Sequence, residues 1–184
     1  MLRSNLAALV FVAGAGLALQ ACKTDGSPTV ASDAGKTARA ALNDASGATK
    51  ARATIVETAE GLKVTVNASG MAPGEYAFHI HTAGKCDAPD FATAGGHWNP
   101  TMKQHGKDNP AGMHMGDMPN LTIGADGTGT LTTTVPGGKL SSGDMPLFDA
   151  DGAALMIHAK PDDYKTDPAG AAGARVACGV VMPG

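Results

Sequence analysis

The sequence predicts an all-β domain, folded as an antiparallel sandwich or barrel. Apolar and polar residues alternate along several short segments, and Asp-Gly pairs and other turn formers separate these segments. Glycine (25 residues) and proline (11) are abundant, whereas aromatic residues make up 4% of the 184 residues. Together these features favour many turns and a core of small and branched aliphatic side chains. No segment has the pattern of a long helix.

Seven short segments carry the strand pattern. In the first two, residues 53–57 and 62–66, the alternation continues on both sides of Glu60-Gly61, as in a hairpin. The other five segments are residues 76–81, 121–123, 128–135, 153–159 and 175–181. Asp126-Gly127 and Asp151-Gly152 are predicted turns. Strands this short and this closely spaced predict an antiparallel arrangement.

Two stretches, residues 82–118 and 160–173, carry no strand pattern. A loop of more than about 15 residues in a compact domain is usually functional or disordered. Five of the six histidines lie within the first stretch or shortly before it. This concentration of imidazoles is the strongest functional signal in the chain.

Composition excludes several classes of function and leaves a single domain. The net charge of −3 excludes the strongly basic surface that duplex nucleic acid requires, so no nucleic acid partner is expected. With 43% hydrophobic and 17% charged residues, the chain is neither a disordered polyampholyte nor a membrane-embedded protein. The length suits one domain with its own core.

The first 21 residues resemble a bacterial lipoprotein signal. Arg3 supplies a positive charge, Leu6–Leu19 is apolar, and Ala21 precedes Cys22, the residue to be acylated. Residues 1–21 are therefore predicted to be a signal peptide and Cys22 a lipid anchor; a plain cleaved signal with an incidental Cys22 is the alternative. Either way the mature chain is exported. Lys23 after Cys22 favours sorting to the outer membrane, with the protein on the periplasmic face.

Residues 22–50 are predicted to be a flexible tether, because Ala, Ser, Thr, Gly and Asp dominate them without hydrophobic periodicity. Ala38–Leu42 is expected to form no more than a transient helical turn. The folded domain is then expected at residues 51–184. With Cys22 used for lipid, Cys86 and Cys178 remain as a pair, and a disulfide is their expected state in an oxidising compartment.

Two sets of side chains have the composition of metal sites. His79 and His81 stand two apart on an expected strand, so both imidazoles point to one face. Alone, such a pair also fits an ordinary polar strand face. The loop residues that follow offer three imidazoles and one carboxylate, the set that a tetrahedral zinc site needs, although histidines scattered by chance in a polar loop are the alternative. These loop residues are His97, His105, His114 and Asp117.

His158 ends the apolar segment 154–158, where a lone histidine is more often structural than a ligand. Combined with His79, His81 and His97, however, it completes a set of four imidazoles, which suits copper. His97 fits both sets. All six histidines are then assigned to two metal sites.

Six short motifs occur in the order of a known family. They are Ala77–His81, Gly95–Pro100, Lys103–Gly106, Met113–Asp117, Met156–Ala159 and Gly173–Gly179. Over residues 52–183 the chain resembles the copper/zinc superoxide dismutases of the bacterial exported type. The resemblance implies a Greek-key, immunoglobulin-like β-barrel of about eight strands with two long functional loops, and copper and zinc as cofactors.

The resemblance also implies a role for individual positions. The implied copper ligands are His79, His81, His97 and His158. The implied zinc ligands are His97, His105, His114 and Asp117, with the His97 imidazole bridging the two ions. Arg175 corresponds to the arginine that holds the incoming anion, so His97 and Arg175 are the implied catalytic residues. Asp162 corresponds to a carboxylate that accepts hydrogen bonds from His79 and His105. Cys86 and Cys178 correspond to the bridge that pins the loop to the last strand.

The implied function is dismutation of superoxide to O2 and hydrogen peroxide, by alternate reduction and reoxidation of a copper ion bridged through His97 to a structural zinc ion. The alternative is a periplasmic copper-binding or copper-buffering lipoprotein on the same fold. Soft thioether ligands beside the loop support it, namely Met102, Met113, Met115 and Met118. A zinc-only structural domain has no need of His158 and Arg175. Lys85, Lys103 and Lys107 are candidates for steering superoxide, and the sequence leaves open whether the chain is a monomer or a homodimer.

Overall fold

Ten strands and one turn of 3₁₀-helix make up the regular structure of the computed structural model, which describes residue 1 and residues 36–184. The strands are β1 (Thr37–Asn43), β2 (Thr49–Glu57), β3 (Gly61–Ala68), β4 (Gly74–Tyr76), β5 (Phe78–His81), β6 (Leu121–Ile123), β7 (Gly129–Pro136), β8 (Ala154–His158), β9 (Arg175–Val180) and β10 (Met182–Pro183). The 3₁₀ turn is η1 (Ala92–Ala94), in the long loop after β5. The predicted signal peptide after Met1 and residues 22–35 of the predicted tether, Cys22 among them, lie outside the described residues.

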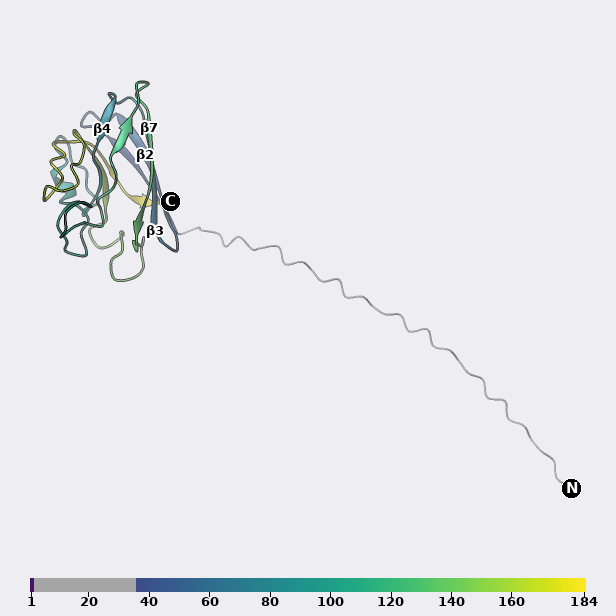
Figure 1. The fold of residues 1–184 in the computed structure, drawn as a ribbon. Helices are drawn as coiled ribbons and strands as arrows, with labels where there is room; N and C mark the ends of the chain where they lie inside the picture. Colours follow the sequence, from purple (N-terminus) through teal and green to yellow (C-terminus); the bar gives the residue numbers. More distant parts are fainter. Residues whose placement is uncertain (2–35) are drawn as a thin grey trace. The chain divides into compact units, whose positions relative to one another are not determined.

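One curled sheet contains eight of the strands, all paired antiparallel. Its path is β5-β8-β9-β1-β2-β3-β7, and β10 pairs with β1. Figure 1 shows β2, β3 and β7 of this sheet beside one another. A smaller sheet joins β4 to β6. The pairs β3–β7 and β9–β1 bring together strands that are distant in sequence, as Greek-key connections do. The expected all-β antiparallel fold of about eight strands is confirmed.

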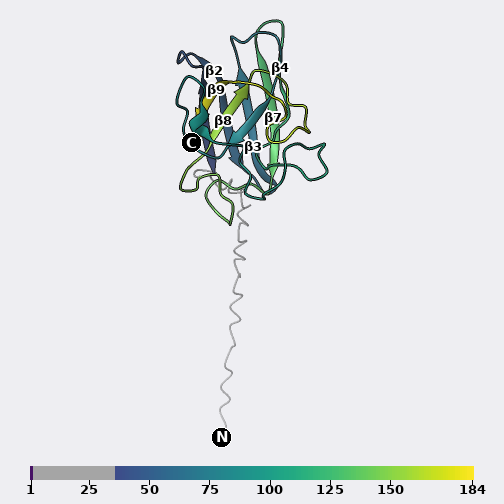
Figure 2. The same ribbon diagram turned by 90° about the vertical axis from the view of Figure 1, so that its left-hand side faces the viewer.

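The core follows from the period-two pattern of the strands. In β5, Phe78 and Ile80 are fully buried in the main hydrophobic cluster, together with Leu155 and Ile157 of β8. The alternate residues of these two strands point to the other side of the sheet, where Met156 belongs to a second, smaller cluster. The loops after β5 and β8 cover this outer side (Figure 2). Polar side chains can therefore be buried outside the barrel core, between the outer side of β5 and β8 and these loops.

The predicted tether is wrong for residues 37–50, because β1 lies within it. β1 pairs along its whole length with β2 and also touches β9 and β10. Its inward side chains are Ala38, Ala40 and Leu42, all buried. Two of these three are alanines, whose weak hydrophobicity hid the alternation and suggested a transient helical turn instead. The domain therefore begins near residue 37 rather than residue 51.

Two further segments differ from the predicted elements. The strand expected at residues 76–81 divides at Ala77, so that β4 pairs with β6 while β5 pairs with β8. Residues 137–153 form a third long connection, which the strand pattern did not single out. Its Leu140 and Leu147 are buried in the core, and the Leu140 amide donates to the Glu57 carboxylate over 2.8 Å. Within the described residues, no helix reaches the length and apolar character needed to cross a membrane.

We expect Leu42→Ala to lower the free energy of unfolding by about 2–5 kcal/mol, because it leaves a cavity around a fully buried side chain of β1. Chemical denaturation of the metal-free protein measures this change. Ala41→Ser, at an exposed position of the same strand, is the control and should change the stability by less than about 0.5 kcal/mol. Equal stability of the two variants would show that β1 is not part of the folding unit.

Candidate metal centre

The six histidines lie between the outer side of the sheet and the loops that cover it. β5 supplies His79 and His81, whose exposed fractions are 0% and 1%, and the neighbouring strand β8 ends at His158. The long loop returns beside the free edge of β5, where the Trp98 amide donates to the Ile80 carbonyl over 2.7 Å. This pairing sets His97 opposite His81, and Asp117 opposite His79. His79 and His81 therefore point to the same face of the sheet, as their spacing predicts.

The four predicted zinc ligands converge on one point. Asp117 Oδ1 lies 2.8 Å from His97 Nδ1, 3.0 Å from His105 Nδ1 and 3.2 Å from His114 Nδ1. The Nδ1 atoms of His97 and His114 are 3.4 Å apart. Ligand atoms at about 2.0–2.1 Å from a tetrahedral zinc ion lie about 3.3 Å from one another. These spacings therefore fit zinc.

Backbone amides hold the Asp117 carboxylate in place. Its Oδ2 atom accepts hydrogen bonds from the Gly106 amide (2.9 Å) and the His114 amide (3.0 Å), which leaves Oδ1 turned toward the three imidazoles. Burial raises the pKa of Asp117, but hydrogen bonds from His105 and His97 and from the backbone outweigh burial and hold it well below its usual range. Asp117 is thus ionised at neutral pH, as a metal-binding carboxylate must be.

The four predicted copper ligands form a second group, in which all ligand atoms lie within 4.8 Å of one another. His81 donates from Nδ1 to the Gly95 carbonyl over 2.9 Å, and His158 approaches the Gly173 carbonyl with Nδ1 at 3.4 Å. Their Nε2 atoms therefore carry the lone pairs, and these two atoms face each other at 3.3 Å. Acceptor atoms that converge in this way are typical of a site that binds a cation.

Two orphaned nitrogens show that the residues fit a metal pair. Among the buried side-chain nitrogens and oxygens that the structure describes, only His79 Nδ1 and His97 Nε2 have no hydrogen-bond partner. A buried polar atom without a partner costs about 1–3 kcal/mol, so such atoms usually have a ligand. Both belong to the group of four imidazoles. His97 thus presents Nδ1 to one group and Nε2 to the other.

Burial keeps three imidazoles of the copper group, those of His81, His97 and His158, unprotonated. It lowers the pKa of His81 to about 2 and, with the nearby His79, the pKa of His158 to about 3. Burial also lowers the pKa of His97 to about 4, against the opposing effect of Asp117. At neutral pH these rings are neutral, and a neutral nitrogen can bind a metal without first losing a proton.

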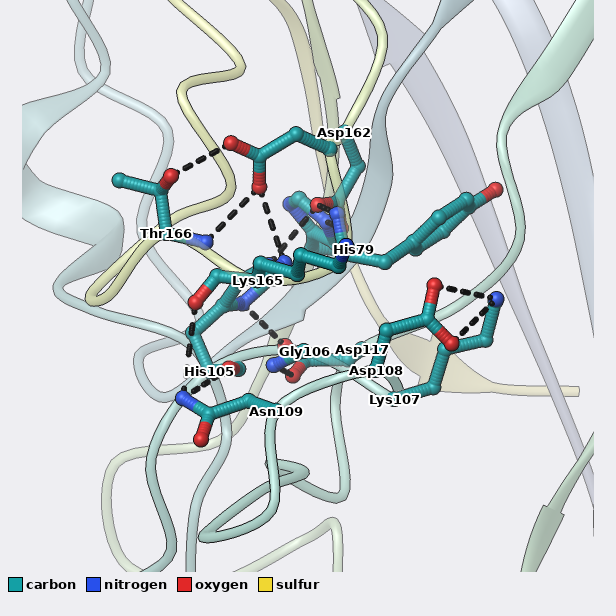
Figure 3. A network of polar contacts seen from close by, with 12 residues as sticks. His79, His105, Gly106, Lys107, Asp108, Asn109, Asp117, Asp162, Lys165 and Thr166 are labelled. Carbon is teal, nitrogen blue, oxygen red and sulfur yellow. Dashed lines mark hydrogen bonds and ion pairs between the residues drawn. The ribbon is translucent and has the colours of Figure 1, made fainter.

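Asp162 joins the two groups, as predicted. Its Oδ2 accepts from His79 Nε2 over 2.8 Å, and its Oδ1 accepts from His105 Nε2 over 2.9 Å (Figure 3). Burial opposes protonation of His105, yet the hydrogen bonds to Asp117 and Asp162 raise its pKa to about 9. The ring is therefore a cation between two carboxylates when no metal is bound. Zinc binding at Nδ1 would release one proton while Nε2 keeps its proton for Asp162.

Three residues that support Asp162 were not found from the sequence. Asn120 holds the Asp162 backbone in two directions, accepting from its amide (2.8 Å) and donating to its carbonyl (3.1 Å). The Tyr164 amide donates to Asp162 Oδ1 over 2.7 Å, and its hydroxyl accepts from the Asn120 amide. Gly170 packs against both the Asp162 carboxylate and the His105 ring. A Cβ at this position would clash with the carboxylate and would lie 2.7 Å from His105 Nε2. The Asn120 contacts join loops that are far apart along the chain, and Tyr164 and Gly170 contact Asp162 within one irregular loop, so no spacing in the sequence signals them.

A pocket of about 410 Å³ opens onto the copper group. It is lined by His81, His97 and His158, and by Arg175, Gly173 and Pro168. Arg175 donates from Nη1 to the Phe91 carbonyl and from Nη2 to the Gly95 carbonyl, each over 2.6 Å. The Gly95 carbonyl therefore receives both Arg175 and His81. Arg175 thus lines the same pocket as His81, His97 and His158.

The predicted disulfide is present and holds this wall of the pocket. Cys86 and Cys178 are bonded, with their Cα atoms 5.6 Å apart. Cys178 lies in β9 three residues after Arg175, and Cys86 lies in the loop that supplies Phe91 and Gly95. The backbone of Gly95 has a φ of 72°, and a Cβ there would approach Thr82 Oγ1 to 2.6 Å, so only glycine suits this position.

The structure gives the other singled-out residues ordinary surroundings. Met118 is buried in the core and Met115 packs against it, which accounts for both without a metal. Met102 is 90% exposed and Met113 is 39% exposed. Lys107 lies over the Tyr164 ring and pairs with Asp108 at 3.0 Å. In the part of the chain that the structure describes, none of the three predicted steering lysines lines the copper-side pocket.

Comparison with known proteins agrees with this geometry. The family model for copper/zinc superoxide dismutase matches residues 49–181. The chain belongs to this family. Superoxide dismutase [Cu-Zn] 1 of Aquifex aeolicus is 48% identical over 132 residues, covering 71% of this chain and 78% of the relative. Superoxide dismutase [Cu-Zn] of Caulobacter vibrioides is 42% identical over 131 residues, covering 70% and 75%.

Solved structures show the same fold. A superoxide dismutase-like protein from Bacillus subtilis superposes with a TM-score of 0.75 at 40% identity, covering 78% of this chain and 97% of that one. Copper/zinc superoxide dismutase from Brucella abortus gives a TM-score of 0.63 at 31% identity, covering 79% and 99%. The chain is a copper/zinc superoxide dismutase, with superoxide as substrate and copper and zinc as cofactors. Bacterial members are generally periplasmic, and the disulfide agrees with an oxidising compartment.

We expect Asp162→Asn to weaken zinc binding by about 10–100-fold, because an amide offers only one oxygen to two imidazole donors. Competition with a zinc chelator measures the affinity. Asp163→Asn, at the adjacent exposed position, is the matched control and should bind zinc as the parent does. Unchanged zinc affinity in Asp162→Asn would show that this carboxylate does not support the zinc ligands.

Proposed function

We propose that this chain dismutes superoxide to O2 and hydrogen peroxide with copper held by His79, His81, His97 and His158, and zinc held by His97, His105, His114 and Asp117. One observation carries the assignment: the buried ring of His97 lies between the two groups. Its Nδ1 lies 2.8 Å from Asp117 Oδ1, while its Nε2 is without a partner on the other side. A single imidazole shared in this way couples the two ions.

The chain's own contribution is to hold a proton and an anion. When bound, copper supplies one-electron chemistry, accepting an electron from one superoxide anion and returning it to another, whereas zinc has no redox chemistry of its own. Peroxide formation consumes two protons. His97 Nε2 faces the copper group and carries a lone pair at neutral pH, so it would hold one of these protons whenever it is not bound to copper.

Arg175 supplies the positive charge that binds the substrate. Its guanidinium is always protonated and is held by two neutral carbonyls, so it attracts superoxide without a proton transfer of its own. Two of its five N–H groups are used in these contacts, and the others remain for the anion. The pocket wall is held by the Cys86–Cys178 bridge, which keeps the guanidinium beside the copper ligands.

We also propose that the chain is exported and anchored through Cys22 on the periplasmic face of the outer membrane. The apolar segment 6–19 and Ala21-Cys22 support processing as a lipoprotein. The acyl anchor would keep the enzyme in the compartment where its disulfide is stable.

Loading the protein with copper and zinc tests the proposed function directly. We expect rapid superoxide dismutation at one copper and one zinc ion per chain, with activity lost when copper alone is removed. The assay is inhibition of a superoxide-dependent dye reduction, with metal content measured on the same sample. Tight copper binding without turnover would instead support a copper-buffering protein.

We expect Arg175→Ala to lower kcat/KM by at least about tenfold, since a partly buried charge that orients the anion is lost. Arg175→Lys should recover part of the rate, because it keeps the charge but not the fork of donors. Steady-state dismutation at matched metal content measures both. The exposed Arg39→Ala is the control for the loss of one positive charge, and parental turnover in Arg175→Ala would contradict the role.

A further inference from the structure

The outward face of β1, β2, β3 and β7 is polar, basic and free of acidic groups. Its exposed or half-exposed positions carry mostly threonine and asparagine. Besides Lys50, which pairs with Asp44 at 3.4 Å, three of them carry the basic residues Arg39, Arg52 and Lys63. Glu57 is the one acidic residue in these four strands. Its side chain is 12% exposed, accepts from the Leu140 amide and lies 3.8 Å from Lys139, so it does not neutralise the face. We call this surface the basic face.

The register spreads the three charges over a flat surface. Arg39 lies opposite Thr54, and Arg52 lies opposite Ala41, so the two arginines are diagonal neighbours on adjacent strands, about 7–8 Å apart. Lys63, on β3, lies opposite Val56. Among the described residues, none of the three forms an ion pair. Met182, 54% exposed, lies opposite Arg39 and joins both arginines along a shallow groove.

This concentration of positive charge contrasts with the rest of the domain. Residues 36–184 contain twelve Lys and Arg and fifteen Asp and Glu. The domain is thus acidic overall, and the basic face has the opposite sign. Separation of charge of this kind orients a protein at a charged surface, because one side is attracted and the other is repelled.

The basic face also begins close, along the sequence, to the predicted point of attachment. Cys22 precedes Lys36 by 14 residues, and β1, which carries Arg39, begins at the next residue. A chain of 14 residues reaches at most about 50 Å. A domain anchored at Cys22 therefore stays close enough to the bilayer for weak attraction to act at a high effective concentration.

We propose that the basic face docks on an anionic phospholipid surface. This inference rests on the lipid anchor proposed above, and it goes beyond the dismutase function. Arg39, Arg52 and Lys63 pair with phosphate groups, and exposed Met182 enters the headgroup layer beside them. The loops of the metal centre cover β5 and β8, on the side of the barrel away from β2, β3 and β7 (Figures 1 and 2). Docking therefore turns the copper-side pocket toward the aqueous phase.

The test measures the accessibility of Lys63 in the full lipidated chain. The protein is reconstituted on vesicles of phosphatidylcholine alone, or of phosphatidylcholine with phosphatidylglycerol, and treated with a water-soluble acetylating reagent. Mass spectrometry compares the rates at Lys63 and at Lys103, an exposed lysine in the long loop. We expect phosphatidylglycerol to slow acetylation of Lys63 at least about threefold at low salt, to leave Lys103 unchanged, and to lose this effect at high salt.

Matched variants assign the protection to the basic face. Arg39→Glu with Arg52→Glu should abolish the protection of Lys63, whereas Lys85→Glu with Lys165→Glu, which changes the net charge equally in exposed loops, should preserve it. Equal rates at Lys63 on both kinds of vesicle, or equal loss in both double variants, would overturn the proposal. So would protection on phosphatidylcholine that grows with protein density, which would indicate a second copy of the chain.

Failure of the lipid anchor has its own signature. A chain that stays free of phosphatidylcholine vesicles carries no effective anchor, and the basic face is then judged from binding to phosphatidylglycerol vesicles. Binding that disappears in Arg39→Glu with Arg52→Glu supports docking by this face even without the anchor. Absence of such binding overturns it, while the dismutase function is measured independently in solution.

Discussion

The metal centre depends on one constraint: a polar layer is buried between the barrel wall and the loops, and each of its polar atoms needs a partner. The buried polar and charged residues of the described chain are all metal-site residues, the six histidines with Asp117 and Asp162. His79 Nδ1 and His97 Nε2 have no partner, and the Nε2 atoms of His81 and His158 meet only each other as acceptors; all four nitrogens belong to the copper group. The loops cover a layer that is complete only with cations in it, so metal binding and loop closure stabilise each other.

Long-range contacts hold this layer together, and they come from the two loops that follow β5 and β8. Asp162 links the loop after β8 to β5 and to the zinc ligands, because its two oxygens accept from His79 and His105. On the copper side, the disulfide links the loop after β5 to β9. The Gly95 carbonyl of that loop accepts hydrogen bonds from both His81 and Arg175. Neither loop has regular structure of its own beyond η1. Their order therefore depends on side chains that also position the chemistry.

The sequence predicts the parts of this arrangement that follow local periodicity or known motifs. Period two sets His79 and His81 on one face, and motif order assigns the remaining ligands and Asp162. Prediction from the sequence fails where the hydrophobic pattern is weak or where the contacts join distant parts of the chain. Alanines in β1 bury little apolar surface each, so the strand resembled a tether, although pairing with β2 on one side and contact with β9 on the other stabilise it. Asn120 reaches Asp162 only through the tertiary fold, and Tyr164 contacts it within an irregular loop that has no periodicity.

Local charge rather than net charge governs how the anion reaches the pocket. The domain is acidic overall, so its distant field does not favour superoxide. At physiological salt, however, the Debye length is about 8 Å, which screens exposed carboxylates farther away. Arg175 is partly buried inside the pocket and held by carbonyls instead of a carboxylate, so among the described residues no ion pair neutralises it. Its positive charge therefore acts directly where the substrate binds, and the surface elsewhere is free to carry the opposite sign.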